Sequence, residues 1–376
     1  MLHVKIRTED LVRGVNHANT VTDKRNTMAI LSNILLSTED NKLVMTATDL
    51  EVTTQIKCPA EITEPGRVTV PAKFFAELVK GVSGEFIILR ETENNSTILS
   101  CGPFSTNLFG LSATDYPKIP EIDNIDYVSF KGPDLIDAIN KTNSSTANSD
   151  DTYNLSGIYL LKEVEDADDP GHLKLISTDG VRLNCATLVA EDPQNFAAEK
   201  GIIIPRKGLL SIRNMAEGNS ILNIGLSENM LAAKNNDSTV AISLLDGMYP
   251  NYKEVVPTDL NITAIIYRKD LLVVLRRIII LLTTKYPLAK FSFTRDLLTI
   301  STSNPEIGQA EETVGIEYTG PDIMAGFNPV LLIDMLVAMN SDQIYLQGKE
   351  SNSSYLMTGP EDPGYYGVVV SAVIND

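Results

Sequence analysis

The hydrophobic and polar positions of this chain follow two periods, one typical of helices and one typical of strands. In six segments the apolar residues lie three and four positions apart, which places them on one face of an amphipathic helix. These predicted helices are residues 9–20, 72–80, 133–141, 206–217, 269–284 and 329–339. They fall in pairs, so that each third of the chain contains two of them.

Between the predicted helices, apolar residues alternate with polar ones and are rich in Val, Ile, Leu and Thr, as in strands. The clearest of these stretches are residues 42–58, 86–91, 96–102, 172–180, 221–235, 290–303 and 343–359. A few helices beside many antiparallel strands indicate an α+β fold.

Parts of this pattern occur more than once. Residues 68–82, 202–216 and 325–339 each run from an apolar, strand-like lead through a proline into an amphipathic helix. The segment TATDLEVTTQI (46–56) has a counterpart in STDGVRLNCATL (177–188). In the same way, GLSATDYPKIPEI (110–122) matches SLLDGMYPNYKEVVP (243–257).

The spacing of these copies sets the size of the repeated unit. Asp49 and Asp179 are roughly 130 residues apart, which is far longer than the solenoid periods of about 20–50 residues. A repeat of this length is a repeated domain. We therefore predict three domains, residues 1–126, 127–260 and 261–376, joined by polar links near 126 and 260.

Composition narrows the class of protein. With 43% hydrophobic and 21% charged residues, the chain can form an ordinary globular core. The cysteines Cys58, Cys101 and Cys185 form neither a disulfide framework nor a zinc motif, so we expect them to be buried in a reducing compartment. The first residues lack the apolar segment of a signal peptide, and Arg276 and Arg277 interrupt the most apolar run. We expect a cytoplasmic protein that does not enter a membrane.

Residues that could carry out catalysis are scarce. The three histidines are far apart in sequence, and the glycine-rich motifs that cradle nucleotide phosphates do not occur. Carboxylates cluster at residues 150–151, 163–169 and 311–312, and paired carboxylates can bind Mg²⁺. Their polar surroundings favour a solvated surface. We predict no catalytic residue, no metal and no cofactor; the alternative is an enzyme that uses the acids near 150–151 or 163–169 with a metal.

The charge of the chain is unevenly distributed. A formal net charge of −18 argues by itself against nucleic-acid binding, because phosphate neutralisation needs clustered Lys and Arg. Residues 268–285, however, include five basic residues and one acid, and residues 205–217 include three and one. Basic helices at matching places in successive repeats indicate one surface that all the repeats share.

Several motifs together resemble those of one known family. They are MAILSNILLS (28–37), TATDLEV (46–52), VTVPAKFF (68–75), GLSATDYPKIP (110–120), YNLSGIYL (153–160), STDGVRL (177–183), IIIPRKG (202–208), LLDGMYPNYKEVVP (244–257) and MAGFNPVLLIDML (324–336). In this order and spacing they resemble the bacterial DNA polymerase III beta subunit family, the sliding clamps, over nearly the whole chain.

The resemblance implies a fold and a function. Three DNA-clamp domains per subunit would form a head-to-tail homodimeric ring, with helices lining the lumen and antiparallel sheets outside. Such a ring is a DNA polymerase processivity factor that encircles duplex DNA without sequence preference and performs no chemistry. Its implied partners bind a cleft through short linear motifs: the DNA polymerase III alpha subunit, the clamp loader, repair polymerases and ligase. The alternative on this scaffold is a monomeric peptide-binding hub.

Matching the motifs residue by residue gives three sets of implied positions. The peptide-binding cleft is implied at Leu155, Thr178, Gly180, Val181, Arg182, Leu183, Pro250, Val255, Val368, Val370, Ser371 and Ala372. DNA-facing positions are implied at Arg25 and Tyr153, to which the basic helix adds Arg206 and Lys207. The dimer interface is implied at Lys73, Thr106, Leu108, Ile280, Leu281 and Glu311.

The sequence departs from the family pattern near the implied cleft. It ends in VVVSAVIND where the family has a Met-Pro-Met-Arg-like run, and Val181 replaces the usual histidine. Glu254 occupies a position that is commonly basic, and the helix 329–339 contains Asp334 but no Lys or Arg. We expect a standard clamp-binding peptide to dock here more weakly than on a typical clamp.

Overall fold

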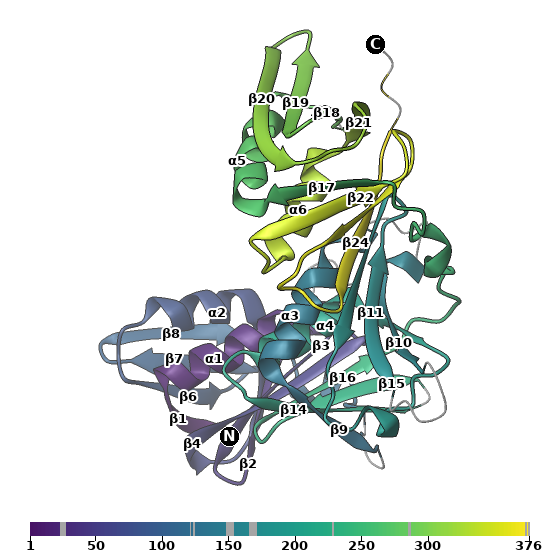
Figure 1. Cartoon of the computed structure of the whole chain (residues 1–376). Helices are drawn as coiled ribbons and strands as arrows, with labels where there is room; N and C mark the ends of the chain where they lie inside the picture. The colour runs from purple at the N-terminus through teal and green to yellow at the C-terminus, as the bar shows by residue number, and fades with distance from the viewer. Residues whose placement is uncertain are drawn as a thin grey trace. The chain divides into compact units, whose positions relative to one another are not determined.

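The computed structural model describes the chain except for residues 23–27, 121, 123–124, 148–153, 165–170, 228, 285–286, 373 and 375–376. In the described part, apart from short 3-10 helices, the order strand, helix, four strands, helix, three strands occurs three times (Figure 1). This order confirms the repeat that the sequence predicts.

The three copies have closely similar elements. The first comprises β1 (His3–Arg7), α1 (Thr8–Asn19), η1 (Ala29–Ser32), β2 (Asn33–Glu39), β3 (Lys42–Thr48), β4 (Val52–Glu64), β5 (Arg67–Pro71), α2 (Ala72–Gly81), β6 (Phe86–Thr92), β7 (Ser96–Cys101), β8 (Phe104–Phe109) and η2 (Ala113–Asp115). The second comprises β9 (Tyr127–Lys131), α3 (Gly132–Asn143), β10 (Gly157–Glu163), β11 (His172–Thr178), β12 (Arg182–Leu188), η4 (Pro193–Asn195), β13 (Ile202–Pro205), α4 (Arg206–Ala216), β14 (Ile221–Leu226), β15 (Met230–Lys234), β16 (Ser238–Ser243) and η5 (Tyr252–Val255). The third comprises β17 (Ile262–Tyr267), α5 (Arg268–Ile278), η6 (Ile279–Leu281), β18 (Ala289–Thr294), β19 (Leu297–Asn304), β20 (Gly308–Glu317), β21 (Ile323–Phe327), α6 (Pro329–Ala338), β22 (Gln343–Gly348), β23 (Ser354–Thr358) and β24 (Tyr365–Val370).

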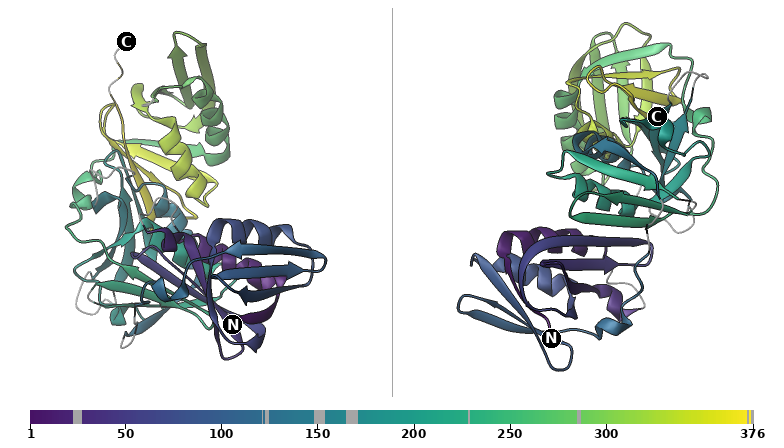
Figure 2. Two further views of the ribbon diagram at one scale, coloured as in Figure 1. Left: turned by 180° about the vertical axis from the view of Figure 1, so that it is seen from behind. Right: turned by 90° about the horizontal axis from the view of Figure 1, so that it is seen from below.

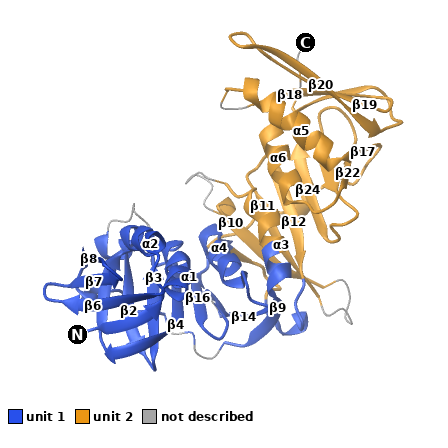
Figure 3. Ribbon diagram, turned by 90° about the vertical axis from the view of Figure 1, so that its left-hand side faces the viewer, with its two compact units in different colours: residues 1–136, 189–197, 204–245 blue, residues 137–188, 198–203, 246–376 orange. Residues whose placement is uncertain are grey.

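The chain forms two compact units (Figure 3). Unit 1 contains residues 1–136, 189–197 and 204–245, and unit 2 contains residues 137–188, 198–203 and 246–376. The main path of the sheet in unit 1 is β8-β7-β6-β1-β4-β16-β15-β14-β9. In unit 2 the strand order runs β10-β11-β12-β24-β23-β22-β17-β20-β19-β18-β21. Each sheet therefore passes from one repeat to the next through a single strand pair, β4–β16 or β12–β24.

The helices form where the sequence predicts an apolar stripe and a favourable start. In unit 1, α1 and α2 lie side by side and bury Leu11, Val15, Phe75 and Val79 (Figure 2). In unit 2, the side chain of Asn328 caps α6 by accepting a hydrogen bond from the backbone N–H of Val330 at 3.0 Å. No helix in the described ranges is long and apolar enough to cross a membrane.

Several predicted strands are in fact pairs of strands. Residues 42–58 contain β3 and the start of β4, and residues 221–235, 290–303 and 343–359 contain β14 with β15, β18 with β19, and β22 with β23. The β18–β19 turn uses Asp296, whose φ is 59°. A tight turn between two alternating runs barely disturbs the alternation, so the hydrophobic pattern reads as one longer strand.

The predicted helix 269–284 is too long by several residues. The α-helix α5 ends at Ile278, and the short 3-10 helix η6 follows it. The apolar residues beyond Ile278 are only partly covered, since Ile280 is 72% exposed and Ile279 and Leu281 are half-buried. The expectation for the cysteines is confirmed, because Cys58, Cys101 and Cys185 are all buried and free.

Candidate functional site

Two turns in the chain have matching hydrogen bonds. They are residues 48–52, the Thr48 turn, and residues 178–182, the Thr178 turn. The Thr48 hydroxyl accepts from the N–H of Leu50 (3.1 Å) and donates to the carbonyl of Val52 (3.2 Å). The Thr178 hydroxyl accepts from the N–H of Gly180 (3.1 Å) and donates to the carbonyl of Arg182 (2.6 Å).

The aspartates that follow these threonines also have matching roles. Asp49 accepts from the N–H groups of Glu51 and Val52 at 3.1 and 2.7 Å. Asp179 accepts from the N–H groups of the two residues at the same positions, 181 and 182, at 3.1 and 3.0 Å. The equivalence of Asp49 and Asp179 that the sequence predicts is therefore confirmed.

The two turns differ at their third residue. Leu50 and Gly180 both have positive φ values, 80° and 88°, a region that glycine adopts readily and leucine adopts with strain. The Leu50 side chain is 55% exposed. A Cβ added at Gly180 would meet no heavy atom within 4 Å, so the space beside the Thr178 turn is open.

Each turn leads into the strand that joins two repeats. Residues 52–56 of β4 pair with residues 238–242 of β16, and residues 182–186 of β12 pair with residues 365–369 of β24. The next backbone bonds also match, because the N–H of Ser243 donates to Glu51 (2.8 Å) and that of Val370 donates to Val181 (3.1 Å). Val181 and Val370 are consequently neighbours at the end of the β12–β24 pair.

The tyrosines of the matching YP segments lie beneath these turns. The Tyr116 hydroxyl donates to the carbonyl of Thr46 at 3.2 Å, and the Tyr249 hydroxyl donates to the carbonyl of Ile176 at 3.5 Å. These bonds confirm that residues 110–122 and 243–257 are copies.

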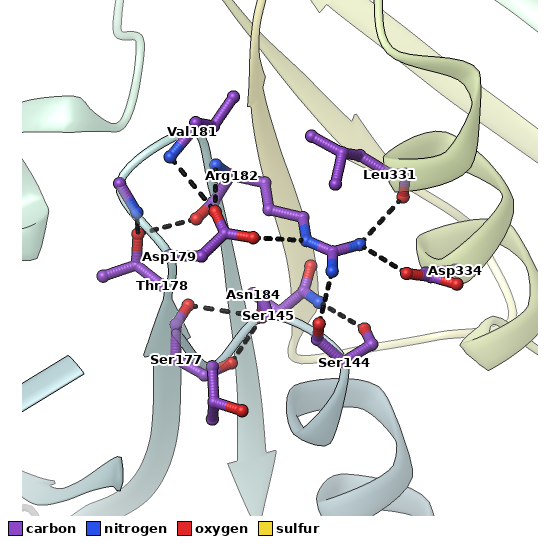
Figure 4. Close-up of polar contacts among 12 residues, drawn as sticks. Ser144, Ser145, Ser177, Thr178, Asp179, Val181, Arg182, Asn184, Leu331 and Asp334 are labelled. Atoms are coloured by element: carbon purple, nitrogen blue, oxygen red, sulfur yellow. Dashed lines mark hydrogen bonds and ion pairs between the residues drawn. The ribbon is translucent and has the colours of Figure 1, made fainter. Parts of the chain in front are cut away.

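Arg182 fixes the Thr178 turn to two other parts of unit 2 (Figure 4). Its Nε donates to Asp179 at 3.1 Å, and its Nη1 donates to Asp334 on α6 at 2.9 Å. The Nη1 also donates to the carbonyl of Leu331 at 3.2 Å, and the Nη2 donates to the carbonyl of Ser144 after α3. The Arg182 side chain is only 6% exposed. Arg182 therefore holds the turn in place and does not present its charge at the surface.

The Thr48 turn has a smaller version of this contact. The ammonium group of Lys207, in the first turn of α4, forms an ion pair with Asp49. The Lys207 side chain is 31% exposed. Among the described residues, its Nζ donates to no backbone carbonyl in addition to Asp49. The equivalent aspartates of the two turns thus pair with different cations, Asp49 with Lys207 and Asp179 with Arg182.

The residues beneath the two turns differ in polarity. Below the Thr178 turn lies a cluster, the apolar floor, made by the buried residues Ile176, Leu183, Cys185, Tyr252 and Val368. The equivalent positions to Ile176, Leu183 and Cys185 below the Thr48 turn are Thr46, Thr53 and Gln55. The Gln55 amide donates to the Thr46 hydroxyl at 3.3 Å. The three positions beneath the Thr178 turn are therefore more apolar than the three matching positions beneath the Thr48 turn.

Apolar side chains also surround the Thr178 turn at the surface. Val181, Val255 and Val370 are 48%, 48% and 46% exposed. Met248 is 89% exposed, and Pro250 is exposed as well. Exposed apolar side chains grouped around a buried apolar cluster are typical of a surface that binds another apolar chain.

The predicted cleft residues thus separate into two groups. Leu183 and Val368 are buried in the floor. Ser371 is also buried, and its hydroxyl donates to the carbonyls of Ser351 (2.7 Å) and Ser353 (2.9 Å). Arg182 is buried in its ion pairs. The members at the surface or half-buried are Leu155, Thr178, Gly180, Val181, Pro250, Val255, Val370 and Ala372.

A charged cluster lies next to the apolar floor. The Glu163 carboxylate accepts from the Tyr252 hydroxyl (2.7 Å) and forms ion pairs with Lys253 (2.7 Å) and Lys174. Burial acts to raise the pKa of Glu163, but the hydrogen bonds from Lys174, Lys253 and Tyr252 outweigh it and lower the pKa to about 2. Glu163 is therefore an ionised side chain that ties η5 to β10, and its two oxygens contact Lys174, Lys253 and the Tyr252 hydroxyl. Residues 150–151 and 165–169 of the enzyme alternative lie outside the described residues.

Sequence comparison identifies the family. Three models of the DNA polymerase III beta subunit match the chain: the N-terminal domain over residues 2–120, the central domain over residues 130–251 and the C-terminal domain over residues 253–372. The chain belongs to the DNA polymerase III beta subunit family.

Individual beta subunits are similar over their whole lengths. The beta sliding clamp of Pseudomonas aeruginosa is 31% identical over 358 residues, 95% of each chain, and that of Vibrio cholerae is 30% identical over 370 residues, 97% of this chain and 98% of the other. A crystal structure of the P. aeruginosa clamp has a TM-score of 0.86 at 29% identity and full coverage of both chains. A Caulobacter crescentus clamp with PEG in its beta-motif tethering region has a TM-score of 0.88 at 26% identity and 99% coverage of both.

Membership in this family establishes the fold class and the general function. The chain has the α+β fold of three DNA-clamp repeats. It is a sliding clamp, a DNA polymerase processivity factor with a tethering cleft, and it is not an enzyme. A related P. aeruginosa clamp structure, with a TM-score of 0.87, contains bound griselimycin.

Sequence reasoning missed part of this beta subunit's site. Tyr249 stacks on Tyr159 with ring centroids 4.8 Å apart, and Tyr252 belongs to the apolar floor, yet neither was among the predicted cleft residues. The signal was present, because both tyrosines belong to the YPNY part of the segment 243–257. A tyrosine with an apolar ring and a polar tip is suited to the boundary between a floor and its rim.

The other predicted positions have mixed surroundings. Among the DNA-facing candidates, Arg25 and Tyr153 lie outside the described residues, Arg206 is half-buried, and Lys207 is paired with Asp49. Among the interface candidates, Lys73, Ile280 and Glu311 are exposed, Thr106 and Leu281 are half-buried, and Leu108 is buried. Glu312, next to Glu311, forms an ion pair with Arg277 of the same chain.

Proposed function

We propose that the surface around the Thr178 turn tethers replication and repair proteins by binding short peptides, and that two copies of the chain close into a ring around duplex DNA. The expected partners are the DNA polymerase III alpha subunit, the clamp loader, repair polymerases and ligase. The ring would act in the cytoplasm, where bacterial DNA is replicated.

One observation carries the peptide-binding proposal. The chain contains the same turn twice, but the Thr178 turn has the more apolar positions beneath it and an open position at Gly180. A leucine or phenylalanine side chain that fills such a site gains about 1.5–3 kcal/mol from burial. At the Thr48 turn, Thr46 and Gln55 place hydroxyl and amide groups at the matching positions, and a leucine, Leu50, occupies the position of Gly180. Peptide binding is therefore expected at one turn in each chain.

The ring proposal rests on two open strand edges. Within the described residues, β8 pairs only with β7, and residues 308–315 of β20 pair only with β19. In the repeats, β8 corresponds to β16 and β24, while β20 corresponds to β4 and β12. Pairing β8 of one chain with β20 of another would repeat the β4–β16 and β12–β24 contacts, and would bring Thr106 and Leu108 near Glu311. Phe109, at the end of β8, is 75% exposed and would be covered there.

The inner surface of the proposed ring would face the DNA. Sliding requires a weakly positive inner surface, because contacts that neutralise many phosphates would hold the ring in place. Lys207 forms an ion pair with Asp49, and α6 contributes Asp334, which is bonded to Arg182. The paired lysine of α4 and the lack of Lys and Arg in α6 keep the positive potential of these helices low and support a lumen that tolerates DNA without binding it tightly.

The peptide proposal can be tested with matched variants of the full chain. Fluorescence polarisation with a labelled clamp-binding peptide should show binding that Val181→Asp weakens by at least about tenfold, since the charge would enter an apolar contact. Leu50→Asp, a charge beside the Thr48 turn, is the control and should leave affinity unchanged. Equal losses for both variants would exclude the Thr178 turn as the site.

The ring can be tested separately. Analytical ultracentrifugation should give a species of about twice the 41.1 kDa chain mass. The protein, once loaded, should stay on circular DNA and leave linear DNA through its ends. A monomer that still binds the peptide would support the peptide-binding hub instead.

A further inference from the structure

The rim around the Thr178 turn has acidic side chains that lack a cationic partner. Asp246 and Glu254 are exposed and lie at the two ends of the segment that contains Met248 and Pro250, and the exposed Val255 follows Glu254. Between described residues, no ion pair involves either carboxylate; Glu254 accepts only a bond from the Asn251 amide at 2.8 Å. Both are free to interact with a bound chain.

The segment that carries these acids is held firmly against the site. Tyr249 stacks on Tyr159 at 4.8 Å, and Tyr252 is buried in the apolar floor. The Asn154 amide, next to Leu155, donates to the carbonyl of Met248 at 3.2 Å. The backbone that carries Asp246 and Glu254 is therefore held next to the apolar floor.

The cations of the same region are held in ion pairs. Arg182 is buried and bonded to Asp179 and Asp334. Lys253 is paired with Glu163 at 2.7 Å, and Lys349, before the turn that binds Ser371, is paired with Asp259 at 3.4 Å. These cations and Lys174, which shares Glu163 with Lys253, number four, and six carboxylates face them once Asp246 and Glu254 are counted, so the rim carries an excess of negative charge.

We propose that the peptides this site prefers are basic, with an apolar anchor flanked by Lys or Arg; this proposal rests on the proposed peptide-binding function of the Thr178 turn. Exposed charge pairs are weak individually, so two of them should change affinity by about threefold to tenfold. Their attraction should act mainly on the association rate and should decline with salt. An acidic flank would be repelled by the same carboxylates.

The experiment uses three fluorescein-labelled peptides with one apolar anchor and flanks of two Lys, two Gln or two Glu. Polarisation titrations of the full chain at 50 and 500 mM NaCl should rank the peptides Lys, Gln, Glu at low salt, with the differences nearly lost at high salt. Glu254→Lys should reduce or reverse the preference. Glu51→Lys changes the net charge equally at the Thr48 turn and should leave the ranking as it is.

The outcomes separate the two proposals. The basic preference would be overturned if the Glu peptide bound as tightly as the Lys peptide, or more tightly, at low salt. It would also be overturned if Glu51→Lys and Glu254→Lys had equal effects. In both cases, binding of the Gln peptide would still support the peptide-binding site. Failure of all three peptides to bind the full chain at either salt concentration would overturn both.

Discussion

Replacement of Arg182 by methionine tests the role of its ion pairs in positioning the tethering turn. Methionine has a similar length but leaves Asp179, Asp334 and two backbone carbonyls without their donor. Removing one partner of a buried ion pair costs about 3–5 kcal/mol. Because the Asp334 side chain is 40% exposed and can regain water, we expect the lower end, about 3 kcal/mol.

Local hydrogen exchange is the appropriate assay, because a chain with several domains need not unfold in one step. The backbone amides of residues 181 and 182 donate to Asp179, so they report directly on the turn. A loss of about 3 kcal/mol should accelerate their exchange by about 100-fold. Unchanged exchange at these two amides would refute the positioning role of Arg182.

Two controls make the result specific. Lys207→Met removes a single, partly exposed pair at the Thr48 turn and should cost about 1 kcal/mol or less. Adding Asp334→Asn to Arg182→Met removes the unpaired carboxylate, so the double variant should lose less than the sum of the single losses. Additive losses would show that the two side chains do not depend on each other.

Three further predictions follow from the same contacts. Gly180→Leu copies the residue that the Thr48 turn tolerates at nearly the same φ, so it should keep the fold by circular dichroism while reducing peptide affinity at least about tenfold by filling the open space; retained affinity would place the peptide elsewhere. For Glu163, whose folded pKa of about 2 is below its ordinary value of 4.5, the stabilising effect is present above about pH 4.5 and is lost as the pH falls toward 2. The stability difference between Glu163→Gln and the unchanged chain should therefore shrink over that range in urea titrations, and a constant difference would contradict the ion-pair account. Phe109→Asp should shift sedimentation to the 41.1 kDa monomer, whereas a persistent dimer would exclude the β8 edge from the interface.

The repeat and the helices could be predicted because they depend on short-range periodicity. The apolar stripe of α1 and the Thr-Asp turns can be recognised from residues that are close in sequence, and the copies fall at matching positions. Strand number was harder, because turns such as that at Asp296 occupy two residues and leave the alternation almost intact.

The role of Arg182 could not be predicted, because it depends on residues distant in sequence. The partner Asp334 is 152 positions away, and nothing in the spacing of the two residues indicates their pairing. The resemblance placed Arg182 among peptide-binding residues, whereas the structure buries its guanidinium group. The difference between Thr46 and Ile176 was visible in the aligned copies, but only the strand pairing shows that both residues lie beneath a turn.

The polar residues beneath the Thr48 turn have a consequence for how many clients a clamp can hold. Because Thr46, Thr53 and Gln55 make that turn the more polar of the two, a ring of two chains would offer two peptide-binding sites and not four. No more than two partner proteins could then be bound to one ring at the same time. The order in which they occupy the ring would be set by their dissociation rates and local concentrations.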